Sequence, residues 1–357
     1  MKEAIIYPGP RVEIVDSPIP VPQAGQVLIR LVVSGSNPKD FKGTFFQPPQ
    51  NFGDDIAGYV ESVGSGVFEF RPGDRVAAFH EMFTPHGSFA EYAIAYAHTT
   101  FHLPREISFE QGATVPLAAM TAALGLYQDL ELPYPWITDE RLPEAERPAL
   151  VVYGAGAAVG SFAVQLARKS NLHPIICVAG QSKDHVETLI DRSKGDTVID
   201  YRLGLEAVVA EVKKALGGKP LLHAFDAIGG SGSDKILGSV LPSANAKLAS
   251  VGFNDRTKIP RTPGMSIEGM TRPKMDPAVS EGVEAFWTVV GSVHGSDKHF
   301  GYIMFRSMAL GLHEGWFKPH PHEVIPGGLD GLADGLTRLS KGQAHAVKYV
   351  YQIGKDS

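Results

Sequence analysis

The sequence predicts an α/β protein that combines a split β-rich domain with a doubly wound parallel sheet. Three observations predict this architecture. Residues 1–100 contain short segments rich in Val, Ile and aromatic residues, separated by Gly and Pro, which is typical of a compact β domain. From Leu150 onward, such segments alternate with helical segments, which favours a parallel sheet with helices on both faces. A last strand, near Lys348–Ile353, is expected to return to the β-rich domain.

The first part of the chain is expected to hold five strands, followed by a helix and a loop. The strands are Glu3–Tyr7, Val27–Ser34, Ile56–Val63, Arg75–Phe79 and Phe89–Ala95. The helix is expected to begin near Ser108, because Ser108 and Gln111 have the spacing of a capping box. Residues 133–148 contain four prolines and many charges, so we interpret them as an exposed connection.

The second part of the chain supplies the strands of the parallel sheet. They are expected at Leu150–Tyr153, Ile175–Val178, Thr197–Asp200, His223–Ala227 and Lys247–Val251. Their short, continuous apolar runs are typical of strands that are buried on both faces. A further helix is expected around Phe300–Leu312.

Composition and charge exclude several classes of function. The 357 residues, 43% apolar and 20% charged, are typical of a globular protein with two domains. The net charge of −6, from 33 basic and 39 acidic residues, leaves no basic footprint for nucleic acid. No apolar run approaches a membrane span, and the N-terminus lacks a signal-peptide pattern. Cys177 is the only cysteine, so no intrachain disulfide can form, and we expect a cytoplasmic protein.

The strongest single motif is VVYGAGAAVGSFAVQLA (Val151–Ala167), in which an apolar strand leads through three glycines into an amphipathic helix. Glycine lets the backbone turn tightly and approach a pyrophosphate, and the helix N-terminus offers free N–H groups to phosphates. The spacing is GxGxxxG, one residue longer than the usual dinucleotide fingerprint, and a purely structural turn is the alternative. The candidate cofactor-binding residues of the turn are Gly154, Gly156, Ala157, Ala158, Val159 and Gly160.

The end of the second strand of the parallel sheet indicates which dinucleotide binds. An NAD enzyme tends to place Asp or Glu there, to bind the ribose 2′-hydroxyl. Here the strand leads into Gly180, Gln181, Ser182 and Lys183, with no carboxylate before the helix. Ser182 and Lys183 are suited to a 2′-phosphate, so we expect NADPH. The alternative is that Ser182 only caps a helix while Lys183 is solvated.

Several motifs, taken together and in order, resemble a known family. They are NPKD (Asn37–Asp40), FGDDIAGYVESVG (Phe52–Gly64), RPGDRVA (Arg71–Ala77), GSFAEYA (Gly87–Ala93), the glycine turn and TVIDYR (Thr197–Arg202). The chain resembles the medium-chain dehydrogenase/reductase superfamily over nearly its whole length. It is most similar to zinc-independent quinone oxidoreductases and to fungal reductases that include trans-acting enoyl reductases. The resemblance implies a split GroES-like catalytic domain, residues 1–120 and 314–357, and a Rossmann domain, residues 121–313.

The resemblance also implies that no catalytic metal is held. Zinc-dependent alcohol dehydrogenases of the superfamily hold zinc with Cys, His and Cys, and these places are taken here by Asn37, Asp54 and Leu117. A leucine cannot ligate, and an amide with one carboxylate makes a poor tetrahedral zinc site. Lys39 takes the place of the hydroxyl that relays protons in those enzymes. We therefore expect no metal ligands.

Without a metal, the oxygen of a carbonyl or enone substrate needs another electrophilic partner. The candidate catalytic residues are Lys42, Lys39, Thr121 and Asn37. Lys42 matches the last position of the NPxDxK pattern of the fungal relatives, and Thr121 resembles the nicotinamide-side threonine of the family. The alternatives are a solvated lysine and a threonine that packs through its methyl group.

Two further cofactor contacts are implied by the resemblance. Tyr201 is placed near the adenosine end, where stacking beside the 2′-phosphate and simple packing at a strand end are the alternatives. Lys348 matches the lysine of a C-terminal KxV pattern. Phe45 and Phe46 occupy the region where some acyl-thioester reductases carry a tyrosine, and we expect them to contribute to an apolar wall.

The expected activity is metal-free hydride transfer from NADPH to the activated C=C or C=O of an enone, quinone or enoyl-type substrate. Such a substrate is a small apolar electrophile. The alternatives are an aldehyde or ketone reductase, a trans-acting polyketide enoyl reductase, and a catalytically idle NADPH-binding protein. We expect neither nucleic acid nor a membrane as partner. A monomer and a homodimer both stay open, since Phe286–Val293 resembles the interface strand of the family.

Overall fold

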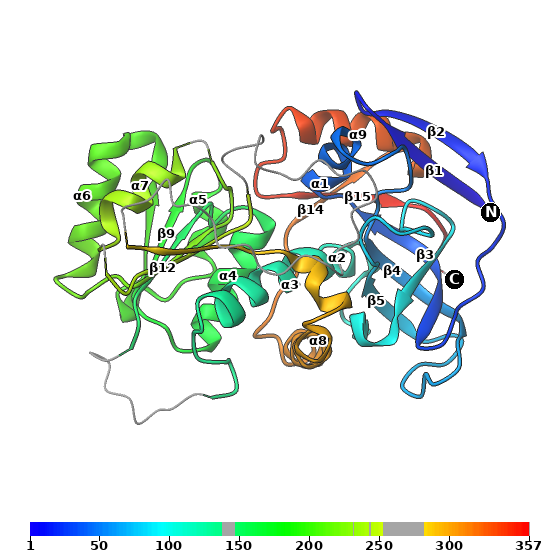
Figure 1. Cartoon of the computed structure of the whole chain (residues 1–357), viewed down its shortest axis with the longest axis horizontal. Helices are drawn as coiled ribbons and strands as arrows, with labels where there is room; N and C mark the ends of the chain where they lie inside the picture. The colour runs from blue at the N-terminus through cyan, green and yellow to red at the C-terminus, as the bar shows by residue number, and fades with distance from the viewer. Residues whose placement is uncertain (138–146, 231, 243, 253–281, 357) are drawn as a thin grey trace. The chain divides into compact units, whose positions relative to one another are not determined.

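The chain forms two compact units in a computed structural model that describes residues 1–137, 147–230, 232–242, 244–252 and 282–356. The β-rich unit consists of Met1–Met120 and of the described residues from Gly291 onward (Figure 1). The Rossmann unit consists of the described residues between Thr121 and Val290. The expected division assigned residues up to 313 to the Rossmann domain, whereas the structure groups α8 (Lys298–Glu314) with the β-rich unit.

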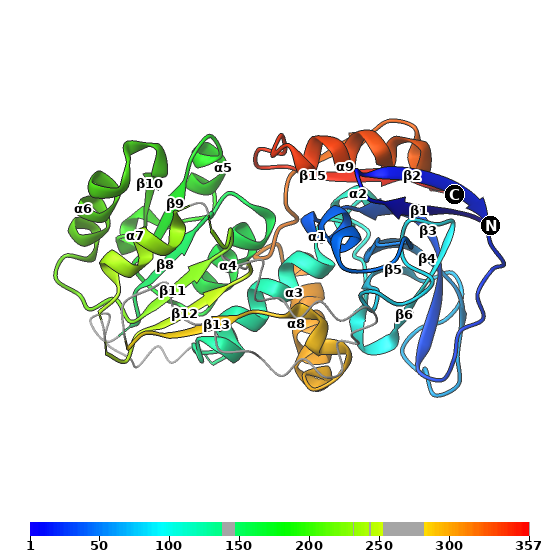
Figure 2. The ribbon, with the colours of Figure 1, turned by 45° about the horizontal axis from the view of Figure 1, so that its top comes forward.

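Six parallel strands form the sheet of the Rossmann unit, in the order β10-β9-β8-β11-β12-β13 (Figure 2). Their bounds are β8 Leu150–Tyr153, β9 Ile175–Ala179, β10 Thr197–Asp200, β11 His223–Asp226, β12 Lys247–Ser250 and β13 Glu284–Trp287. Counted along the chain, this is the order 3-2-1-4-5-6 of a dinucleotide-binding sheet, which changes direction between β8 and β11. The predicted parallel sheet is confirmed.

Helices cover both faces of this sheet, because alternate strand residues point to opposite sides. Val151, Ile176 and Ala224 belong to one apolar cluster with Val208 of α6 and Leu237 of α7. The intervening strand residues are equally buried, and α4 packs against β8, β9 and β11. The helices of the unit are α4 Ala158–Lys169, α5 Lys183–Glu187, α6 Leu205–Leu216 and α7 Ser233–Val240.

The interface strand suggested by the family resemblance is shorter than expected and lies earlier in the chain. Phe286–Val293 was expected to form it, but β13 covers Glu284–Trp287 and pairs with β12 along one side only. Residues Val290–His294 form a 3₁₀ helix instead. The β-branched residues of this stretch therefore did not distinguish a strand from a tight helical turn.

The β-rich unit is built on a seven-stranded sheet and a separate hairpin of β1 (Lys2–Tyr7) and β2 (Arg11–Asp16). The sheet strands are β3 Gln26–Gly35, β4 Asp55–Val63, β5 Arg75–Phe79, β6 Tyr92–Tyr96, β7 Thr100–His102, β14 His322–Ile325 and β15 Lys348–Gln352. β15 pairs with β3, which confirms that the last strand returns to this unit. β2, β7 and β14 were not predicted, because each is a short run of three to six residues.

Short helices connect the strands of the β-rich unit. They are α1 Pro38–Lys42, α2 Phe109–Gly112, α3 Pro116–Leu124, which continues into the Rossmann unit, α8 and α9 Leu332–Ser340. The predicted capping box is present at α2, where Gln111 N–H donates to Ser108 Oγ over 3.2 Å. No helix in the described part of the chain is long and apolar enough to cross a membrane.

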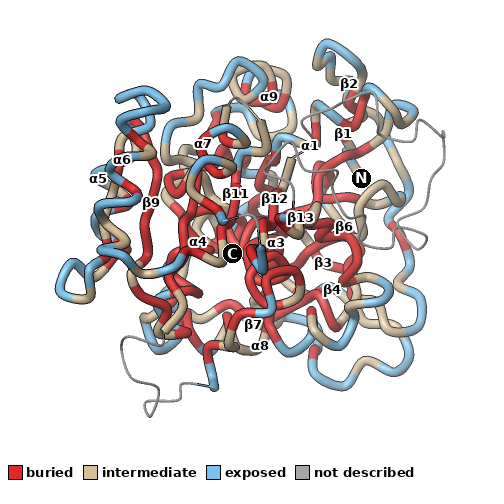
Figure 3. Tube along the Cα trace, turned by 60° about the vertical axis from the view of Figure 1, so that its left-hand side comes forward, coloured by how far each residue is buried: buried red, intermediate tan, exposed pale blue. Residues whose placement is uncertain are grey.

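The core of the β-rich unit is apolar but contains buried histidines, among them His80 and His98. Strands β3 and β4 are buried over most of their length (Figure 3). His80, at the end of β5, has a side chain that is only 2% exposed, and its Nδ1 lies 2.7 Å from the Ile94 carbonyl oxygen. His98 is 8% exposed, and its Nε2 lies 3.0 Å from the Val293 carbonyl oxygen. Burial lowers the pKa of each imidazole to about 4.

These histidines predict a loss of stability in mild acid. The unfolded chain binds protons at pKa values near 6.5, so protonation favours unfolding as the pH falls from 6.5 to 4. The free energy of unfolding is expected to fall by up to about 1.4 kcal/mol per pH unit for each histidine. Thermal unfolding measured across this range should show the decline, with a smaller slope in His98→Gln than in the surface control His313→Gln. Equal slopes in these two variants would contradict the assignment.

Candidate functional site

The glycine turn between β8 and α4 has the shape of a phosphate cradle. Gly154 adopts φ +75°, a conformation that favours glycine, and its N–H donates to the Val178 carbonyl over 2.9 Å. A Cβ on Gly160 would lie 2.2 Å from the Gly154 carbonyl oxygen, so only glycine lets α4 start this close to the strand. The N-cap of α4 is Ala157, which has no side-chain oxygen to occupy the first N–H groups. Those groups are thus left for an anion.

The structure brings Ser182 against this turn. A Cβ on Gly156 would lie 1.7 Å from Ser182 Oγ, so the two residues are in direct contact. Ser182 stands at the N-cap of α5, but its hydroxyl makes no capping hydrogen bond there. The alternative that this serine only caps a helix is therefore wrong, and its hydroxyl lies beside the glycine turn.

Lys183, Asp200 and Arg202 form a small charged group near Tyr201 at this edge of the sheet. The Tyr201 ring lies over Gly180, where an added Cβ would meet it at 2.4 Å, and the side chain is 48% exposed. Arg202 Nε donates to Asp200 over 2.8 Å, and the hydrogen bonds from Arg202 lower the pKa of Asp200 to about 2. The exposed Lys183 contributes to the same lowering, which places its ammonium near Asp200. Arg202 was part of the TVIDYR motif but was not predicted as a binding residue.

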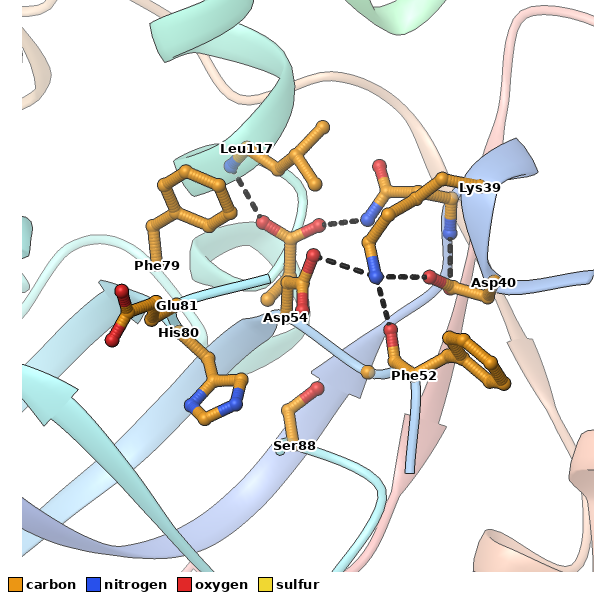
Figure 4. A network of polar contacts seen from close by, with 12 residues as sticks. Lys39, Asp40, Phe52, Asp54, Phe79, His80, Glu81, Ser88 and Leu117 are labelled. Carbon is orange, nitrogen blue, oxygen red and sulfur yellow. Dashed lines mark hydrogen bonds and ion pairs between the residues drawn. The ribbon is translucent and has the colours of Figure 1, made fainter. Parts of the chain in front are cut away.

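A buried network of charges lies in the β-rich unit, where α1 meets the segment before β4 (Figure 4). Lys39 Nζ lies 2.7 Å from Asp54 Oδ2 and 3.1 Å from Asp40 Oδ1, and it also donates to the Phe52 carbonyl. Pro38 at the start of α1 and the Asn37 N–H, which donates to Asp40 Oδ2 over 2.7 Å, fix the helix that carries Lys39.

A second lysine completes the network from the C-terminal strand. Lys348 Nζ lies 2.5 Å from Asp55 Oδ2 and 3.1 Å from Asn37 Oδ1, and its side chain is almost fully buried. Asn37 Nδ2 donates to the same carboxylate over 2.6 Å, and the Leu117 N–H donates to its other oxygen over 2.7 Å. Lys348 was expected to contact the cofactor, but the structure shows its ammonium bound inside this network. Its partner Asp55 was not identified from the sequence.

The network holds more carboxylates than ammonium groups. Asp40, Asp54 and Asp55 are all buried, and the two lysines supply only two positive charges. Burial raises the pKa of Asp54 to about 8 and that of Asp40 to about 6, against the attraction of Lys39. Burial lowers the pKa of Lys39, but the charges of Asp54 and Asp40 outweigh it and leave that pKa above its usual value. The lysine is therefore charged, and the network holds a proton on its carboxylates near neutral pH.

Aromatic side chains surround the Lys39 ammonium. Its Nζ lies 5.4 Å from the ring centre of Phe83 and 6.0 Å from that of Phe52. Phe46 packs edge-on against Phe83 at 5.6 Å, as expected for an apolar wall, whereas Phe45 is 72% exposed. These rings give the ion pair an apolar flank and add a weak attraction for the ammonium.

The remaining catalytic candidates occupy different positions. Lys42, at the end of α1, is exposed and three residues beyond Lys39. Thr121 is buried on α3 and belongs to the Rossmann unit. Asn37 is occupied by the Asp55 and Lys348 hydrogen bonds. The structure thus brings Lys39 and Asn37 into one network.

The residues in the places of the zinc ligands do not suit a metal. Asn37 turns its amide toward Asp55, Asp54 already has the ammonium of Lys39 against it, and Leu117 contributes only its backbone N–H. A divalent cation there would have to displace a lysine held by two carboxylates. Over the described ranges, no three His, Cys, Asp or Glu side chains are grouped as a metal site.

Comparisons with known proteins agree with the fold described above. Residues 23–105 match the family described as the alcohol dehydrogenase GroES-like domain. The trans-enoyl reductase fsr4 of Gibberella fujikuroi is 45% identical over 334 residues, which cover 92% of this chain and 91% of that protein. The trans-enoyl reductase resD of Aspergillus sclerotiorum is 32% identical, covering 97% and 98%. A putative zinc-dependent alcohol dehydrogenase from Rhizobium etli shares the fold, with TM-score 0.78, 20% identity and coverage of 100% and 99%.

The contact between Gly156 and Ser182 predicts a specific defect and its rescue. The variant Gly156→Ala places a methyl group into Ser182, and such overpacking costs about 1–3 kcal/mol of unfolding free energy. Because no other side chain is in the way, Gly156→Ala combined with Ser182→Gly should recover most of this loss. Thermal unfolding of the two variants measures both effects. A double variant no more stable than Gly156→Ala would refute the contact.

Proposed function

This chain belongs to the enoyl reductase-like branch of the medium-chain dehydrogenase/reductase superfamily, and on that basis we propose that it reduces the activated C=C or C=O of a small apolar substrate with NADPH and without a metal. It is an oxidoreductase of the enoyl reductase type. The observation that carries the proposal is the glycine turn, whose uncapped helix N-terminus is joined by Ser182 and by basic side chains.

The choice of NADPH rests on the charges beside the turn. Ser182 offers a hydroxyl, and Lys183 and Arg202 offer positive charges at the edge where a ribose 2′-phosphate is expected. Asp200 is the carboxylate of this group, and Arg202 pairs with it through two hydrogen-bonding nitrogens, so its charge is largely compensated. The exposed face of Tyr201 gives the adenosine end a flat apolar surface.

When bound, the reduced nicotinamide supplies the hydride. The chain's own residues bind and orient the dinucleotide and the substrate, and they exclude water from the reacting atoms. Gly154, Gly156 and Gly160, with the N–H groups of Ala157, Ala158 and Val159, hold the pyrophosphate. In this proposal, Lys42 and Thr121 orient the nicotinamide end and the substrate oxygen.

Metal-free chemistry follows from what occupies the place of zinc. The Lys39 ammonium is a positive charge beside Asp54, which takes the place of one zinc ligand of the zinc-dependent alcohol dehydrogenases. Asn37 and Lys348 both donate hydrogen bonds to Asp55, and Lys348 also donates to the Asn37 side-chain oxygen. In this proposal, lysine side chains of the β-rich unit supply the positive charge that zinc supplies in the zinc-dependent enzymes.

The substrate class follows from the relatives and from the aromatic surroundings of Lys39. Both relatives described above are named trans-enoyl reductases, and that name supports an enoyl thioester as the natural acceptor. Phe46 and Phe83 pack edge-on near the charged network, and the buried Phe52 packs behind Phe83. In this proposal, the rings of Phe46 and Phe83 suit an uncharged acyl chain. In this proposal the partner is the substrate itself, with neither nucleic acid nor a membrane involved.

The proposed 2′-phosphate contact predicts the effect of removing one charge. In Lys183→Ala, the KM for NADPH should rise about tenfold, because one charge-assisted hydrogen bond is worth about 1.5–3 kcal/mol. The KM for NADH should stay unchanged. Steady-state rates with both cofactors, with Lys194→Ala as a surface control, measure this preference. Equal increases for NADPH and NADH would contradict the assignment of Lys183.

The activity itself is tested with a panel of acceptors. Protein that has been dialysed against a chelator should oxidise NADPH in the presence of enones, quinones or enoyl thioesters at its full rate, because no step needs zinc. Lys42→Ala should lower kcat/KM about tenfold or more by removing an electrophilic contact. NADPH binding without turnover of any acceptor would overturn the reductase assignment, and loss of activity on dialysis would overturn the metal-free mechanism.

A further inference from the structure

We propose that Lys39, Asp40 and Asp54 form a proton store that supplies the proton consumed when the substrate double bond is reduced, with Lys39 as its outlet. This inference rests on the proposed reductase activity and names residues for a step that hydride transfer alone leaves open. We call these three residues the proton store.

The first argument is the charge balance. In the described structure, the network joins three carboxylates to two ammonium groups, in surroundings closed by Phe52 and Phe83. Burying an uncompensated negative charge costs several kcal/mol, which is avoided when one carboxylate takes up a proton. Asp55 accepts hydrogen bonds from Lys348, Asn37 and the Leu117 N–H, whereas Asp40 and Asp54 share the ammonium of Lys39.

The second argument is where the extra proton resides. Among the described residues, Asp54 has the Lys39 ammonium 2.7 Å from its Oδ2, but it accepts no backbone N–H on either carboxylate oxygen. Asp40 receives the Asn37 N–H on one oxygen and has none on the other. Asp54 is therefore the carboxylate that gains most from protonation, and the direction of its pKa shift agrees.

The third argument is the route outward. The side chains of Asp40 and Asp54 are at most 1% exposed, whereas that of Lys39 is 17% exposed. Lys39 touches both carboxylates and reaches solvent, so a proton leaving Asp54 passes through its ammonium. His80 also feels the charge of Lys39, but its imidazole is tied to the Ile94 carbonyl and is neutral near pH 7.

The proposed step balances atoms and charge. One carbon of the C=C bond gains the hydride from NADPH, which leaves as NADP⁺, and the neighbouring carbon gains a proton from Lys39 Nζ. The Asp54 proton then restores the ammonium, and a proton from water restores Asp54. Among the described residues, the titratable groups facing the store include Asp55 on β4, Lys348 and Tyr351 on β15 and His80 after β5. His80 stays neutral through the step, because burial lowers its pKa to about 4.

The variant Asp54→Asn separates this role from a structural one. It keeps the shape of the side chain and leaves two carboxylates against two lysines, so the unfolding temperature should stay the same or rise. The protonated carboxyl band in the infrared spectrum of the cofactor-free protein at pH 7 should disappear. With NADPH and an enone, kcat should fall at least tenfold, and the wild-type decline of kcat above pH 8 should be lost, while KM for NADPH stays the same.

A second variant and a matched control complete the test. Lys39→Arg keeps the positive charge but does not release a proton, so it should fold, bind NADPH and lose kcat at least tenfold. Asp129→Asn removes another buried carboxylate, which accepts from Thr288 over 2.7 Å, and should retain the wild-type pH profile and infrared band. Wild-type rates and pH profiles in Asp54→Asn or Lys39→Arg would overturn the proton store. A wild-type protein that reduces no acceptor would overturn the proposed function instead, and the infrared band would still report on Asp54.

Discussion

The arrangement of the β-rich unit depends on one buried lysine. Lys39 connects α1 to the segment before β4 through two carboxylates and a backbone carbonyl. If its ammonium were removed, Asp40 and Asp54 would face each other without a counterion in an apolar surrounding, at a cost of several kcal/mol. The lysine thus has the organising role that a bound cation has in other proteins, and α1, the residues that follow it and the Lys348 network are positioned around it.

The Rossmann unit depends on steric rather than electrostatic constraints. Gly154, Gly156 and Gly160 each stand where an added Cβ would meet another atom within 2.5 Å. The strand, the turn and α4 are therefore packed so closely that the N–H groups at the start of α4 have fixed positions. The two units divide the chemistry in the proposed function: one holds the dinucleotide with backbone groups, and the other holds charge with side chains.

Local pattern was sufficient to predict most of the fold. β5, β8 and β10 have the predicted bounds, because each is an apolar run closed by turn residues. β2, β7 and β14 were missed, and the strand expected at Phe286–Val293 lies at Glu284–Trp287, since such short strands are recognised by their partners rather than by their own composition. The site was harder to predict. The sequence pointed to Lys39 and Asn37, but the contacts of Lys39 with Asp54 and of Lys348 with Asp55 join residues from distant parts of the chain, and no spacing rule connects them.

The close approach of Ser182 to Gly156 has a consequence for how the cofactor preference can change. The usual route from a 2′-phosphate to a free ribose hydroxyl is to install a carboxylate at the end of the second strand. Here Ser182 stands three residues past the end of that strand and touches Gly156, so a change of side chain at residue 182 also changes the packing against the turn. If the proposed NADPH preference holds, a single substitution at residue 182 would therefore alter the turn and the ribose contact together.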